Sequence, residues 1–116
     1  MRNLKKEEQD LIVFMLRDNS LNKDYTQDIS KSTVQEMDDG GMGSLKFLYN
    51  DGKMRKFHKG IANISILDID EVPVSFAINV DDNGDLFELD VFKGDFSPLQ
   101  QFPIPPYKVL PPPQRL

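Results

Sequence analysis

The strongest constraint on the fold is the alternation of apolar and polar residues between Val74 and Phe92. Asn83-Gly84, a dipeptide typical of two-residue hairpin turns, lies near the middle of this segment. A turn at this dipeptide gives three apolar cross-strand pairs: Val80 with Phe87, Ile78 with Leu89, and Phe76 with Val91. Since all three pairs fall on one face, the segment predicts an antiparallel hairpin with a single buried face.

Two further segments with a period of two predict more strands. Between Leu45 and Phe57, a three-residue loop over 50–52 with Gly52 left-handed pairs Leu45 with Phe57 and groups the apolar side chains. A two-residue turn would instead mix the two faces. The apolar segment 61–69 changes phase within its length, which predicts a bulged strand.

The first 33 residues follow the helical period instead. Residues 4–17 predict a helix with Asn3 as its N-cap and a broad apolar face. The polar segment 18–33 carries apolar residues at four-residue spacing and suits a second, short helix or turns. The expected fold class is therefore α+β: one or two N-terminal helices packed on a mainly antiparallel sheet of five or six strands.

The C-terminal segment is rich in proline. Seven of the eight prolines lie in the last 19 residues, which excludes a helix or a central strand there. We expect a single α+β domain over 1–102 and a partly packed tail over 103–116, with the end Pro111–Pro113 projecting as polyproline II. Five apolar residues are expected to pack along the sheet or a helix: Phe96, Leu99, Phe102, Ile104 and Tyr107.

Charge is distributed unevenly along the chain. The net charge is −5, but residues 60–100 hold nine acidic residues and the single base Lys93, a net charge of −8. This balance argues against nucleic acid as a partner. The absence of cysteine excludes disulfides and thiol chemistry, and no apolar run approaches the ~18 residues of a membrane span. We expect a cytoplasmic protein without a cofactor.

The acidic block contains the candidate partner-binding residues. On the strand 86–92 the pattern places Leu86, Glu88, Asp90 and Phe92 outward, a mixture of charge and apolar surface that suits an interface. The full candidate set is Asp68, Asp70, Glu71, Glu88, Asp90 and Phe92. A basic protein such as a toxin would be the natural partner. The alternative is a solvated acidic rim, with a helix or the tail covering the apolar positions.

Other candidate sites carry weaker signals. Asp81, Asn83 and Asp85 mimic part of a calcium loop, but flanking strands favour a metal-free hairpin tip. The segment Asp38-Asp39-Gly40-Gly41 is either a functional site or a wide turn; it precedes a strand, whereas a phosphate-binding loop precedes a helix. His58 has no nucleophile tied to it, so we do not expect an enzyme. A small-ligand or cation-binding module and a small enzyme remain the alternatives.

Two sequence blocks carry a resemblance. The segments DDGGMGSLKF (38–47) and FELDVFKGDFSPL (87–99) resemble those of a family of small bacterial proteins of unknown function. The resemblance covers most of the chain, up to about residue 102. It implies a bacterial, single-domain, cytoplasmic protein and assigns no catalytic residue. In size and charge the chain is also similar to immunity proteins of bacterial toxin systems.

Overall fold

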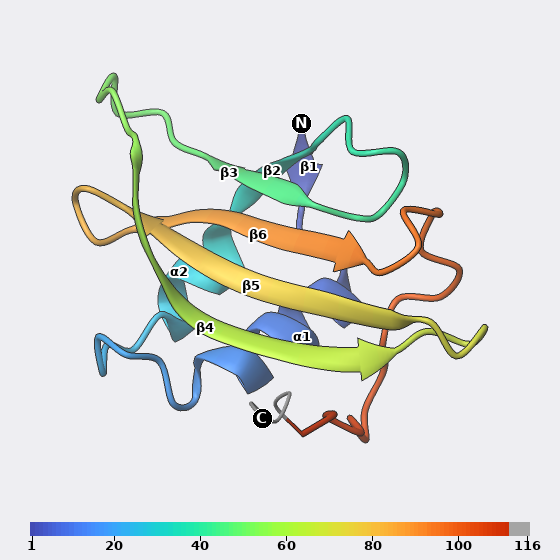
Figure 1. Ribbon diagram of the computed structural model, residues 1–116. Helices are drawn as coiled ribbons and strands as arrows, with labels where there is room; N and C mark the ends of the chain where they lie inside the picture. The colour runs from blue at the N-terminus through green and yellow to red at the C-terminus, as the bar shows by residue number, and fades with distance from the viewer. Residues whose placement is uncertain (112–116) are drawn as a thin grey trace.

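The computed structural model describes residues 1–111, in which two helices cover one face of a six-stranded sheet (Figure 1). The helices are α1 (Lys6–Leu16) and α2 (Thr26–Lys31). The strands are β1 (Arg2–Asn3), β2 (Thr33–Glu36), β3 (Leu45–Leu48), β4 (Phe57–Leu67), β5 (Pro73–Asp81) and β6 (Leu86–Lys93). Their order in the sheet is β1-β2-β3-β6-β5-β4, and all neighbours are antiparallel. The α+β prediction is confirmed.

The β5–β6 hairpin forms as predicted through most of its length. Ile78 lies opposite Leu89, both are fully buried, and the Phe76–Val91 pair is also present. The register differs near the tip, because a bulge at residues 79–80 pairs Val80 with Leu86 instead of Phe87. Leu86 is therefore 1% exposed, and the prediction that it points outward is wrong.

The hairpin predicted between Leu45 and Phe57 does not form. β3 pairs with β2 and with β6, while β4 pairs with β5 at the opposite edge of the sheet. Residues 49–56 therefore connect two strands that β6 and β5 separate. Leu45 gains Leu89 as its buried neighbour, whereas Phe57 stays 55% exposed. Gly52 does have the left-handed backbone expected of it, with φ 70°.

The strand β4 is irregular at its beginning. Register shifts lie between Phe57 and Lys59 and between Gly60 and Ala62. The bulge expected within 61–69 therefore lies at the start of that segment. The pattern of apolar residues also shifts by one position near Leu67. This shift is not a bulge, because β4 ends at this residue.

Helix α1 begins later than predicted, and its N-terminus is held by another residue. Asn3 belongs to β1, so its assignment as N-cap is wrong. The backbone N–H of Lys5 donates to the Glu8 carboxylate at 2.8 Å. Arg2 donates two hydrogen bonds to the same carboxylate, which ties the first turn of α1 to β1. No helix within residues 1–111 is long and apolar enough to span a membrane.

The tail runs from the end of β6 past the ends of β5 and β4 and returns toward α1 (Figure 1). Leu99, Phe102 and Tyr107 pack against the core, as predicted. Phe96 and Ile104 are 71% and 59% exposed and do not join the core, although the Phe96 ring contacts Phe92 of β6. Pro112 and Pro113 lie outside the described residues, and the polyproline II prediction concerns that part of the chain.

Candidate functional site

Three of the predicted partner-binding residues lie together on the face of the sheet opposite the helices. On β6, the buried residues Leu89 and Val91 alternate with Glu88, Asp90 and Phe92. These three positions lie opposite residues of β5, and Glu88 also lies opposite Lys46 of β3. Figure 1 shows this face unobstructed by either helix. We call it the uncovered face.

The two carboxylates of the uncovered face have different surroundings. Asp90 accepts a 2.7 Å hydrogen bond from the side-chain amide of Asn79. Partial burial raises the pKa of Glu88, the negative charge of Asp90 raises it further, and Lys46 opposes the shift. Repulsion between two neighbouring carboxylates is relieved by an added cation, so this pair would attract a basic group.

An exposed aromatic pair lies beside the carboxylates. The rings of Phe92 and Phe96 meet edge to face, with centroids 5.1 Å apart. Phe92 is 46% and Phe96 is 71% exposed. Phe96 has a left-handed backbone, with φ 64°, which is uncommon for a bulky side chain. The uncovered face therefore combines two acids with exposed apolar surface.

Asp68, predicted as a surface contact, lies inside the protein. Its side chain and that of Lys93 are both fully buried, with Nζ 2.8 Å from Oδ2. Its oxygens also accept backbone N–H groups from Ile69, Gln100 and Gln101. Burial alone would raise the pKa of Asp68, but these hydrogen bonds and Lys93 outweigh it and hold the pKa below its usual value. Asp68 therefore shapes the fold and cannot contact a partner directly.

Asp70 and Glu71 follow in the turn between β4 and β5. Lys93 also donates to Asp70, whose side chain is 26% exposed. Glu71 is exposed and has a left-handed backbone, with φ 65°. Sequence reasoning missed the burial of Lys93, although Lys93 continues the inward phase of Leu89 and Val91 along β6.

The candidate cation site at the β5–β6 tip is occupied by an arginine of the protein. Arg55 Nη1 donates to Asp81 and to Asp85, each at 2.7 Å, and its guanidinium stacks on Tyr49. The other Asp81 oxygen accepts the backbone N–H groups of Asn83 and Asp85. Within residues 1–111 no group of three or more His, Asp or Glu side chains is arranged to hold a metal ion. Sequence reasoning missed Arg55 because it assigned the residue to a different hairpin.

The glycine-rich segment 38–44 forms a wide turn. Gly40, Gly41 and Gly43 all have positive φ. The Asp39 carboxylate accepts the backbone N–H groups of Met42 and Ser44, and although burial opposes it, this bonding lowers the pKa of Asp39. The carboxylate is thus engaged in shaping the turn.

This turn also joins the two sequence blocks that carry the resemblance. The hydroxyl of Ser44 lies between the backbone N–H and carbonyl of Val91, at 2.9 and 3.2 Å. The backbone N–H of Leu99 donates to the carbonyl of Gly41. The blocks 38–47 and 87–99 are therefore in direct contact.

Comparison with known proteins gives one match. No curated protein and no solved structure is similar to the chain at a significant level. The model of a domain of unknown function, DUF6984, matches residues 1–103, a span that includes both helices and all six strands. The chain therefore belongs to the DUF6984 family.

Proposed function

We propose that this protein is a non-catalytic protein-binding module of the immunity or antitoxin kind. Its partner is a basic protein, such as a toxin, that binds the uncovered face. The observation that carries the proposal is the juxtaposition of Glu88 and Asp90 with the exposed Phe92–Phe96 pair. At interfaces, buried aromatic side chains supply affinity, and charges supply orientation and a faster association rate.

The position of these side chains supports the proposal. Glu88, Asp90 and Phe92 project from β6, which pairs with β5 along most of its length and with β3 at Glu88 and Leu89, and Phe96 lies in the turn after β6. A strand held in this way loses little conformational entropy when a partner binds. Glu71 and Asp95 are exposed in the turns at the end of β6 where Phe96 lies and add negative charge there, whereas Asp70 is paired with Lys93.

The bonding of the buried acids supports a non-catalytic role. Among the described residues three acids are buried, and each is paired with a cation: Glu8 with Arg2, Asp68 with Lys93, and Asp81 with Arg55. Pairing of this kind fixes the position of each carboxylate. These acids therefore stabilise the fold.

The test compares two double charge reversals that change the net charge equally. Glu88→Lys/Asp90→Lys alters the uncovered face, and Asp18→Lys/Asp28→Lys alters exposed positions in the helical layer. The native protein is used to capture a partner from an extract of the source organism, and the captured protein is then purified. We expect its Kd to rise at least about tenfold for the first variant and about twofold or less for the second.

Salt dependence provides a second readout. Association with the native protein should slow as the salt concentration rises, because attraction between exposed charges is screened. Circular dichroism establishes that both variants are folded. Equal Kd values for the native protein and Glu88→Lys/Asp90→Lys would contradict the proposal.

A further inference from the structure

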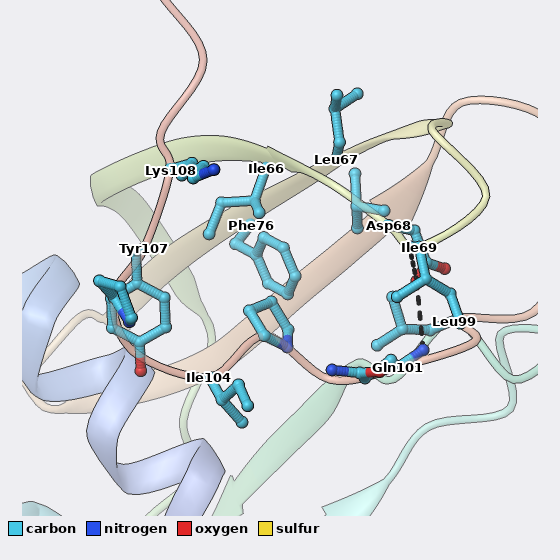
Figure 2. Close-up of a pocket in the computed structure, with 13 residues that line it drawn as sticks. Ile66, Leu67, Asp68, Ile69, Phe76, Leu99, Gln101, Ile104, Tyr107 and Lys108 are labelled. Atoms are coloured by element: carbon cyan, nitrogen blue, oxygen red, sulfur yellow. Dashed lines mark hydrogen bonds between the residues drawn. The ribbon is translucent and has the colours of Figure 1, made fainter.

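A pocket lies between the sheet and the tail, on the face that the helices cover. Its volume is about 200 Å³. Figure 2 shows Ile66 and Phe76 on one side of it and the tail on the other. Its walls include Ile66, Val74 and Phe76 from β4 and β5, and Leu99, Ile104 and Tyr107 from the tail. All six side chains are largely apolar.

The tail is fixed on both sides of this pocket. Before it, the Asp68 carboxylate accepts the backbone N–H groups of residues 100–101 at 2.8 and 3.1 Å. After it, the backbone N–H of Leu110 donates to the carbonyl of Ser65 at 2.8 Å. The tail therefore spans the pocket between two attachment points.

The segment between the attachments cannot easily close onto the sheet. It contains three prolines: Pro103, Pro105 and Pro106. Proline fixes φ and lacks the N–H group that a strand would need in order to pair with the sheet. The pocket is thus a consequence of where the tail is attached and of the residues between the attachments.

The lining determines what would bind. Phe76 and Val74 are buried and form the floor, and the partly exposed ring of Tyr107 favours offset or edge-to-face contact with another ring. The one acid in the lining, Asp68, already accepts bonds from Lys93 and three backbone N–H groups. Lys108 also lines the pocket but is exposed to water. An anion could pair only with Lys108, whose exposed charge is screened by water, so a charged ligand would lose hydration for little gain.

From this geometry we infer that the pocket under the tail binds a small, neutral aromatic molecule of one or two rings. An apolar cavity of about 150 Å³ is large enough for benzene, so this pocket has room for a somewhat larger ring system. The site is separate from the uncovered face, and the two can be tested independently.

The test uses indole as the neutral probe and benzoate as an anionic probe of similar size. Indole should cause saturable changes in the amide NMR signals of Val74, Phe76 and Gln101, with a Kd on the order of 1 mM or lower. Benzoate should bind at least about tenfold more weakly. Leu99→Phe, which adds volume to the pocket wall, should weaken indole binding at least about tenfold.

Met54→Phe is the matched control, because Met54 is 95% exposed in the connection 49–56, outside the pocket. It should leave the Kd of indole unchanged. If Leu99→Phe does not fold, Ile66→Phe fills the same pocket from the opposite wall. The inference is overturned if indole causes no saturable change, if the changes lie elsewhere, or if the filling variant binds indole like the native protein. Equal binding of benzoate would overturn the requirement for a neutral ligand.

Discussion

The acids of this protein perform different tasks according to the side chains that surround them. Asp68 is fully buried against Lys93, whereas Glu88 and Asp90 remain partly exposed on the same sheet. Breaking a buried ion pair by removing one partner is costly, because the other charge stays buried without compensation. An exposed pair contributes much less.

The first prediction compares two acids that share Lys93. Asp68→Asn should lower the free energy of unfolding by about 3 kcal/mol, because it removes the buried charge partner of the lysine. Asp70→Asn should cost less than about 1 kcal/mol, because the Asp70 side chain is 26% exposed and its ion pair is partly screened. Urea unfolding at neutral pH measures both values. Equal losses would show that burial does not distinguish the two acids.

The contribution of Asp68 to the free energy of unfolding should decrease as the pH falls. Its pKa in the folded protein lies below the usual value, so folding favours the charged form. The resulting stability is complete above the unfolded pKa of about 3.9 and is lost as pH falls through the folded pKa. The difference in urea midpoint between the native protein and Asp68→Asn should therefore shrink below about pH 4. A difference that stays constant down to pH 2 would contradict this assignment.

At the scale of elements, the sequence predicts local pairing better than distant pairing. The alternation around Ile78 and Leu89 is sufficient to establish their register, because a one-residue slip would turn the apolar face to solvent. The bulge that turns Leu86 inward lies beside the tip, where the Asp81 carboxylate accepts two backbone N–H groups. The two-residue period does not encode this bonding.

The connection 49–56 shows why the other hairpin was not predicted correctly. The Leu45 side chain can be buried against Phe57 or against Leu89, and the alternation of apolar and polar residues fits both pairings. The second pairing is favoured by contacts distant in sequence, among them the bonds of Arg55 to Asp81 and Asp85. Such contacts become visible only once the order of the strands is known.

The second prediction concerns the buried face of the hairpin. Ile78→Ala or Leu89→Ala should lower the free energy of unfolding by about 2–5 kcal/mol, because each leaves a cavity in a fully buried site. Ser75→Ala, at an exposed position on the opposite face of β5, should change it by about 0.5 kcal/mol or less. Chemical denaturation measures all three values. A loss below about 1 kcal/mol at Ile78 or Leu89 would mean that the two faces of the sheet were assigned the wrong way round.

At the scale of the whole molecule, ion pairs formed on folding neutralise part of the negative charge of residues 60–100. The −8 charge of residues 60–100 includes Asp68 and Asp70, which contact Lys93, and Asp81 and Asp85, which contact Arg55. The sequence therefore overstates the acidic surface but indicates correctly where Glu88, Asp90 and Phe92 point. Net charge alone does not tell paired acids from free ones, since pairing depends on tertiary contacts.

The most direct test of the central claim is a footprint of the bound partner on apolar side chains of the two faces. Hydroxyl-radical oxidation of the protein is compared with and without the purified partner. The account predicts that oxidation of Phe92 and Phe96, on the uncovered face, falls on binding, while oxidation of Val13 and Phe14 on α1 is unchanged. Protection of Val13 and Phe14 with none at Phe92 and Phe96 would contradict it and assign binding to the helical layer.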